Sequence, residues 1–190
     1  VMKIFLIGFN ASGKREVCDK LTSLGVRVGK NFRSIEDVPD NIYTNSRVVY
    51  SSEDIESIFE NNAFVFFTSN TTNTESFFEG LSFFEYENND VFEMTPDQFS
   101  KVPKFDDDVL FVWMDSNVSQ RRNRHILEKR KYNFYNQEDL ENLDTQDFTT
   151  RINDYDYLYF VNEEPCRVSA IIYSLVKHPE LIDLYKESFN

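Results

Sequence analysis

The chain has 190 residues, of which 41% are hydrophobic and 16% aromatic, and its formal net charge is −13. This length fits one domain, or a core with small inserted subdomains. The acidic balance argues against a general binder of nucleic acid or of an anionic membrane, because phosphate groups attract positively charged surfaces. No apolar run approaches the length of a membrane span.

The two cysteines, Cys18 and Cys166, lie far apart and lack the spacing of metal ligands. We therefore expect no zinc site and a reducing, intracellular compartment. A cytoplasmic location follows from this expectation. The Asn- and Phe-rich composition would also suit the cytoplasm of a virus-infected host cell.

The first elements are expected in the order strand, loop, helix. Residues 2–8 form a continuous apolar run, which is typical of a buried parallel strand. Residues 13–23 predict a helix, because their apolar side chains recur at helical spacing. Gly25 ends this pattern, and residues 26–28 predict a short second strand.

The next part of the chain is more polar. Residues 30–50 are irregular, and Ser51–Ser52 provides the expected N-cap of a following helix. A strand is predicted at 63–68, a loop rich in Ser, Thr and Asn at 69–76, and a further short strand at 81–86.

A strand at 91–94 is expected to lead into a helix that has Thr95 as its N-cap and Pro96 as its first residue. Residues 109–114 form the most apolar strand, and a basic helix is expected after it, to about residue 131. The remaining expectations are a polar segment at 132–150, a strand at 156–161, a helix at 165–177 and a short helix from Pro179.

Strands that alternate with helices predict an α/β fold with a parallel central sheet. The polar stretches 30–90 and 130–150 would then be insertions at the carboxyl edge of the sheet. Sheets of this class bind ligands at that edge.

The sequence Gly-Phe-Asn-Ala-Ser-Gly-Lys at 8–14 lies between the first strand and the first helix. This is the context of a phosphate-binding loop, in which backbone N–H groups and the helix N-terminus surround phosphate oxygens. Lys14 is expected to contact the β and γ phosphates. Arg15 replaces the Ser or Thr that would hold Mg²⁺. The expected ATP-binding residues are Gly8, Asn10, Ala11, Ser12, Gly13, Lys14 and Arg15.

Several segments, in their shared order, resemble guanylate kinase, a P-loop nucleoside monophosphate kinase. Residues 31–34 (Asn-Phe-Arg-Ser) resemble the family's Thr-Thr-Arg segment, and residues 47–55 resemble its Tyr-x-Phe-Val-Ser-x-Glu-Glu-Phe segment. Residues 119–124 (Ser-Gln-Arg-Arg-Asn-Arg) are similar to its lid-entry helix. The best-matching segment is 155–162 (Tyr-Asp-Tyr-Leu-Tyr-Phe-Val-Asn), which is similar to the strand before the family's last helix.

The resemblance implies a three-layer P-loop NTPase fold with an inserted monophosphate-binding subdomain and a short lid. It implies transfer of the γ-phosphoryl group of ATP, supplied with Mg²⁺, to a nucleoside or deoxynucleoside monophosphate. A monomer or a homodimer is expected. The core would comprise 1–30, 89–130 and 150–190, the insertion 31–88, and the lid 131–149.

The resemblance also implies roles for individual side chains. Arg33 and Tyr50 would bind the acceptor monophosphate, with Arg47 as a further candidate, because a planar guanidinium suits bidentate phosphate contacts. Arg124 and Arg130 would clamp phosphates at the entry to the lid. The cations expected to assist the transfer are Lys14, Arg124 and Arg130.

Asp115 ends the most apolar strand and has two interpretations. The pattern is that of a Walker-B aspartate, and it also suits the N-cap of the next helix, which is the interpretation we favour.

Three residues depart from the family pattern. Arg15 replaces the hydroxyl, Thr95 replaces an acidic residue after the middle strand, and Phe66 lies where the family has a Glu that reads guanine. Guanine specificity is therefore not expected, unless Glu75 or Glu79 takes that role. A working kinase is the favoured interpretation. The alternatives are a binding or structural module that has lost turnover and a P-loop kinase for another small molecule.

Overall fold

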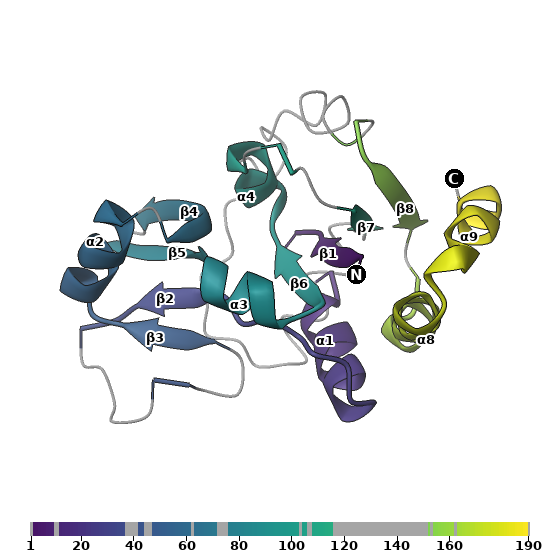
Figure 1. Cartoon of the computed structure of the whole chain (residues 1–190), viewed down its shortest axis with the longest axis horizontal. Coiled ribbons are helices and arrows are strands. Elements are labelled where there is room, and N and C mark those ends of the chain that lie inside the picture. The colour runs from purple at the N-terminus through teal and green to yellow at the C-terminus, as the bar shows by residue number, and fades with distance from the viewer. Residues whose placement is uncertain are drawn as a thin grey trace.

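The computed structural model describes residues 2–9, 12–36, 42–43, 47–61, 63–71, 76–102, 104–105, 108–115, 152, 154–161 and 163–189. Its centre is a four-stranded parallel sheet with the strand order β6-β1-β7-β8 (Figure 1). The strands are β6 (Val91–Met94), β1 (Lys3–Ile7), β7 (Val109–Asp115) and β8 (Asp156–Val161). The predicted α/β fold with a parallel central sheet is therefore confirmed.

Alternation along β1 sends side chains to both faces of this sheet. Ile4 and Leu6 pack against α1 (Lys14–Ser23) and α8 (Pro165–Lys177). Phe5 and Ile7 point to the other face, where α4 (Pro96–Lys101) contributes Phe99. Both faces are covered, which explains why β1 and β7 are continuously apolar rather than alternating. Beyond α8 the chain continues through a short 3₁₀ helix (Pro179–Leu181) into α9 (Ile182–Phe189).

A second sheet lies beside the first and has the strand order β3-β2-β5-β4 (Figure 1). Strands β2 and β3 are parallel, whereas β5 is antiparallel to both β2 and β4. Phe32, Val48 and Ile55 form the small core of this unit. Its elements are β2 (Phe32–Ser34), β3 (Val48–Tyr50), α2 (Ser52–Glu60), β4 (Phe64–Thr71), β5 (Ser76–Ser82) and α3 (Phe83–Asn88).

The second sheet is joined to the central one by aromatic and aliphatic packing. Phe66, Leu81 and Tyr86 belong to the same buried cluster as Phe5 and Phe92 of the central sheet. The ring centroids of Tyr86 and Phe92 are 5.4 Å apart. This packing holds the face of the second sheet that carries Phe66 and Leu81 toward the core.

Local signals fix the ends of several helices, as the sequence predicts. Gly25 has φ 81°, and the N–H groups of Gly25 and Val26 donate to the carbonyls of Thr22 and Leu21, which is a Schellman motif. Ser51 caps α2 by accepting from the N–H of Asp54 at 3.0 Å. Thr95 caps α4 in a reciprocal capping box with Gln98.

Three local expectations were wrong. Of the strand expected at 81–86, only Leu81 and Ser82 are extended, as the end of β5, because Ser82 caps α3, which begins at Phe83. Residues 69–71 and 76 of the expected loop 69–76 belong to the strands of the β4–β5 hairpin, since β4 reaches Thr71 and β5 begins at Ser76. Residues 26–28 form no strand, and Val28 makes a single parallel bridge to Val91. The segments expected as a basic helix and as a lid lie outside the described residues.

Both cysteines lie in helices, as expected: Cys18 is buried in α1 and Cys166 is exposed in α8. Within the described ranges, no helix is both long and apolar enough to cross a membrane.

Candidate functional site

The phosphate loop leaves the carboxyl end of β1 and enters α1. Gly8 is required at its start, because a Cβ there would lie 2.7 Å from the backbone oxygen of Met114. Gly13 has φ 99°, a left-handed conformation that glycine adopts without strain, and it is the N-cap residue of α1. Asn10 and Ala11 lie outside the described residues.

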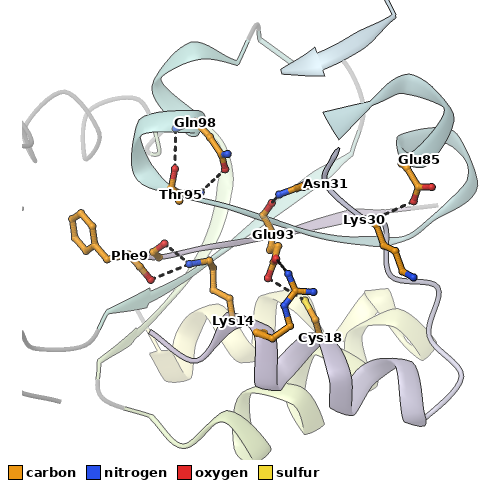
Figure 2. Close-up of polar contacts among 11 residues, drawn as sticks. Phe9, Lys14, Cys18, Lys30, Asn31, Glu85, Glu93, Thr95 and Gln98 are labelled. Carbon is orange, nitrogen blue, oxygen red and sulfur yellow. Dashed lines mark hydrogen bonds and ion pairs between the residues drawn. The ribbon is translucent and has the colours of Figure 1, made fainter. Parts of the chain in front are cut away.

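Lys14 is the first residue of α1, and its side chain folds back over the loop (Figure 2). Its ammonium group donates to the carbonyl oxygens of Gly8 at 2.5 Å and Phe9 at 2.9 Å. A phosphate oxygen that enters the loop can replace these carbonyls as acceptor. Ser12, also in the loop, has a buried hydroxyl for which no hydrogen-bond partner is found within the described ranges.

Arg15 forms an ion pair with Glu93 of β6, at the place where the motif normally has its metal-binding hydroxyl. The side chains of Arg15 and Glu93 are 35% and 14% exposed, so the pair is largely shielded from water. The other carboxylate oxygen of Glu93 lies 3.9 Å from the thiol of Cys18 (Figure 2). Burial raises the pKa of the Cys18 thiol well above its ordinary value, and the negative charge of Glu93 raises it further.

These residues do not fit a protein-held magnesium ion. A guanidinium occupies the position of the hydroxyl, and the adjoining carboxylate is already paired with it. In the part of the chain that the structure describes, no group of three or more His, Cys, Asp or Glu side chains is placed to hold a metal.

Sequence reasoning missed Glu93. The available signal was an acidic residue inside the apolar strand 91–94, preceded by Phe92 and followed by Met94. The Glu93 side chain points to the α1 side of the sheet, because the side chains of Phe92 and Met94 pack on the opposite face. The side-chain amide of Asn31 donates to the Glu93 carbonyl at 3.0 Å and thereby fixes this part of β6 (Figure 2).

Arg33 lies on the face of the second sheet that also carries Phe66 and Leu81. It is directly opposite Glu79 in the β2–β5 pairing, and its guanidinium carbon lies 3.8 Å from the ring centre of Phe77. Burial raises the pKa of Glu79, while the charges of Arg33 and Arg47 lower it and the charge of Glu93 raises it. Arg33 therefore lies beside Glu79, and the charge of Arg47 also acts on that carboxylate.

Tyr50 is placed differently. It packs in the small core of the second sheet, with its ring centroid 6.2 Å from that of Phe32. Phe32 and Arg33 are consecutive residues of β2, so their side chains point to opposite faces. The structure therefore places Arg33 beside Glu79 and Tyr50 on the other face of the sheet. Arg124, Arg130 and Glu75 lie outside the described residues.

Phe66 is 3% exposed and packs into the core cluster with Leu81, so its ring is not available to read a base. Thr95 serves as the cap of α4. Asp115 accepts a hydrogen bond from the hydroxyl of Tyr159 at 2.5 Å, and the pKa of Tyr159 is raised to about 12 by burial and by this bond. The helix that Asp115 was expected to cap lies outside the described residues.

Replacement of Glu79 by glutamine is expected to stabilise the protein at pH 7. Folding raises the pKa of Glu79 above its ordinary value of 4.5, so the protonated form favours the folded state. That contribution is complete below pH 4.5 and is lost as the pH rises through the folded-state pKa. The advantage of Glu79→Gln over wild type should therefore shrink as the pH falls from 7 toward 4.5, as measured by urea unfolding.

The matched control for this experiment is Glu87→Gln, since Glu87 is an exposed residue of α3. This variant should follow the wild-type pH dependence. A Glu79→Gln variant that is less stable than wild type at pH 7 would contradict the expectation and would show that the two arginines dominate over burial.

No protein-family model and no curated protein sequence matches the chain. The structure of guanylate kinase from Anaplasma phagocytophilum matches with a TM-score of 0.56 at 13% identity, over 93% of this chain and 84% of that chain. The chain shares the guanylate kinase fold. A sugar kinase from Janibacter sp. HTCC2649 matches over 96% of this chain and 98% of that chain, with a TM-score of 0.48 and 12% identity.

The similarity to the guanylate kinase structure agrees with the expected α/β fold. At 13% identity it establishes the fold alone, and the substrate has to be argued from the side chains of the site.

Proposed function

We propose that the protein is a nucleoside monophosphate kinase that transfers the γ-phosphoryl group of ATP to a nucleoside or deoxynucleoside monophosphate. The observation that carries the proposal is the pairing of two cationic regions. Lys14 lies over the phosphate loop, and Arg33 lies opposite Glu79 on the core-facing side of the second sheet, where the charge of Arg47 also acts on Glu79. One region suits the donor phosphates and the other suits an acceptor phosphate.

The residues of this chain would act by positioning the phosphates and neutralising their charge, which is the main requirement of phosphoryl transfer. Lys14 exchanges its two loop carbonyls for phosphate oxygens. The Arg33 guanidinium already lies over the Phe77 ring, and this contact would restrict its motion before the acceptor binds. ATP enters as its magnesium complex or as the free anion, and its phosphates and water supply the ligands of any ion it carries.

The test is a coupled assay of ADP release with ATP, with and without Mg²⁺, against the common ribo- and deoxyribonucleoside monophosphates. Turnover with one acceptor above the ATP-only background supports the proposal and names the substrate. Measurable ATP binding without turnover on any acceptor would contradict it.

The second candidate is a binding module with the same fold and no turnover. The Arg15–Glu93 ion pair favours it, because the hydroxyl that would help to orient a metal is missing. In the assay this candidate gives nucleotide binding by calorimetry together with no release of ADP.

Arg33→Ala is expected to raise the KM for the acceptor by about 10- to 100-fold, because a hydrogen bond to a charged group contributes about 1.5–3 kcal/mol. The KM for ATP should change little, since the phosphate loop is unaltered. Steady-state kinetics with each substrate varied in turn measure both constants.

The matched control is Arg27→Ala. Arg27 is also paired with a carboxylate, Asp90 at 2.8 Å, but it lies outside the two cationic regions. This variant should retain both KM values. An equal rise in the two KM values of Arg33→Ala would indicate a general loss of structure and would contradict the assigned role.

A further inference from the structure

The second sheet carries an open apolar groove beside α2, on the face turned away from the core. Phe67 of β4 and Phe78 of β5 pack against the small core of this sheet, so their rings lie on that outer face. Together with Ile55 and Phe59 of α2 they line a pocket of about 310 Å³, which we call the α2 groove. Figure 1 shows α2 at the end of the molecule opposite α9, whereas the phosphate loop follows β1 near the centre.

A row of aromatic rings lines the α2 groove and ends in an exposed side chain. The ring centroid of Phe67 lies 5.2 Å from that of Phe78 and 5.1 Å from that of Phe59. Phe59 is 54% exposed, although Ile55, one turn earlier in α2, is fully buried. Exposed apolar surface that adjoins a hollow is typical of a site that another molecule covers. The groove therefore suits one apolar side chain of a partner.

The rim of the α2 groove is acidic. Glu56 and Glu60 line it and lie one helical turn apart on α2. Glu53 and Asp54 lie in the first turn of the same helix, which contains no lysine or arginine. Within the described part of the chain, no ion pair neutralises Glu56 or Glu60. A partner with a basic segment would therefore meet complementary charge around the apolar pocket.

Glu60 is placed where a negative charge is unfavourable. It is the last residue of α2, at the end of the helix where the backbone carbonyls produce negative potential, and the last turn has no basic residue. A lysine or arginine of a partner beside Glu60 would relieve this repulsion. A cation over the exposed ring of Phe59 would gain further from the negative face of that ring.

We propose that the α2 groove docks a basic segment of a partner protein, in which one Leu or Phe enters the groove and flanking Lys or Arg side chains pair with Glu56 and Glu60. The apolar anchor supplies the contact area, and the two carboxylates select the sign of charge. Because the groove holds a single anchor, the interaction is weak and transient. The inference goes beyond the proposed function and does not rest on it, since no residue of the groove belongs to the nucleotide site.

The experiment is a fluorescence anisotropy titration of a labelled synthetic peptide with the full chain. The peptide places Leu-Phe between two Lys-Arg pairs. One control peptide has Ala-Ala in place of Leu-Phe, and the other has Glu-Glu in place of each basic pair. We expect the basic apolar peptide to bind with a Kd at least about tenfold lower than either control. Added salt should weaken its binding, because the pairing charges are exposed.

Two variants test the two parts of the groove. Phe59→Ser removes the exposed ring and should raise the Kd of the basic apolar peptide by about tenfold or more. The double variant Glu56→Gln with Glu60→Gln should raise it by about tenfold and reduce its dependence on salt. ATP binding should be unchanged in both variants. The matched controls lie in α3: Phe84→Ser, at a side chain that is 64% exposed, and Glu87→Gln should retain the wild-type Kd for the peptide.

The outcomes that would overturn the inference are distinct. They are equal binding of the three peptides, an unchanged Kd in Phe59→Ser, and no binding of the basic apolar peptide at the highest protein concentration. A dimer of the wild type in sedimentation, lost in Phe59→Ser, would identify a second copy of this chain as the occupant and would equally overturn the basic partner. Each of these results leaves the proposed kinase function standing, because the assay of ADP release tests that function separately.

Discussion

Replacement of Lys14 by alanine is expected to lower kcat/KM for ATP by about 100- to 1000-fold. This is the scale observed when one preorganised donor is removed from a developing negative charge. The structure gives the reason, because the Lys14 ammonium lies 2.5 and 2.9 Å from two loop carbonyls and is the group best placed to follow the β and γ phosphates. ATP binding by calorimetry should weaken in the same variant.

Lys20→Ala is the matched control for this result. Lys20 lies in the last turn of the same helix and is exposed, so its loss changes the charge of α1 without touching the loop. It should retain activity within about twofold. Equal activity of Lys14→Ala and wild type would contradict the assignment of the loop as the donor site.

Replacement of Phe5 by alanine is expected to destabilise the fold by about 3–5 kcal/mol, the usual cost of removing a fully buried phenylalanine. Phe5 is 0% exposed, and its ring centroid lies 4.9 Å from that of Phe92 and 5.1 Å from that of Phe105. Because it lies in β1, three residues before Gly8, the cavity would also loosen the strand that supports the phosphate loop. Urea unfolding measures the loss.

The control is Phe84→Ala, the same chemical change at a side chain that is 64% exposed. Its free energy of unfolding should stay within about 0.5 kcal/mol of the wild-type value, as for most surface substitutions. An equal loss in the free energy of unfolding in both variants would contradict the expectation that burial of Phe5 in the core stabilises the fold.

Much of the fold was predictable because the central sheet is buried on both faces. A strand in that environment is apolar at every position, and residues 109–114 carry that signal without help from other parts of the chain. Strand β8 lies at the edge of the sheet, and its buried Leu158 and Phe160 alternate with exposed residues. Helix α8 was predicted with the correct ends because Pro165 begins it and Pro179 follows it closely. Local chemistry was sufficient for these elements.

The second sheet was harder to predict, because its phenylalanines follow no clear alternation. Phe77 and Phe78 point to opposite faces of β5, one against Arg33 and the other against Phe67. Phe83 and Phe84 were read as a strand, although Ser82 caps a helix at that point. An apolar run of this length is consistent with either a strand or a helix, and only the tertiary context decides.

In the site, the sequence predicted the residues of the loop and missed the partner of Arg15. Lys14 and Arg15 are marked by their place in a motif, whereas Glu93 lies 78 residues further along the chain. Its role depends on β6 pairing with β1, which no local pattern reveals. Glu79 is also hard to predict from local sequence. Its partner Arg33 belongs to β2, and Arg47, whose charge also acts on Glu79, precedes β3.

The contrast between the two cysteines provides a probe of motion that needs no mutation. Cys166 is exposed at the start of α8, so a maleimide dye should attach there first. Cys18 is 2% exposed, and burial raises the pKa of its thiol, so the reactive thiolate forms only when α1 moves away from β6. The rate of incorporation of a second label then reports how often this helix opens, and nucleotide binding at the loop should slow it.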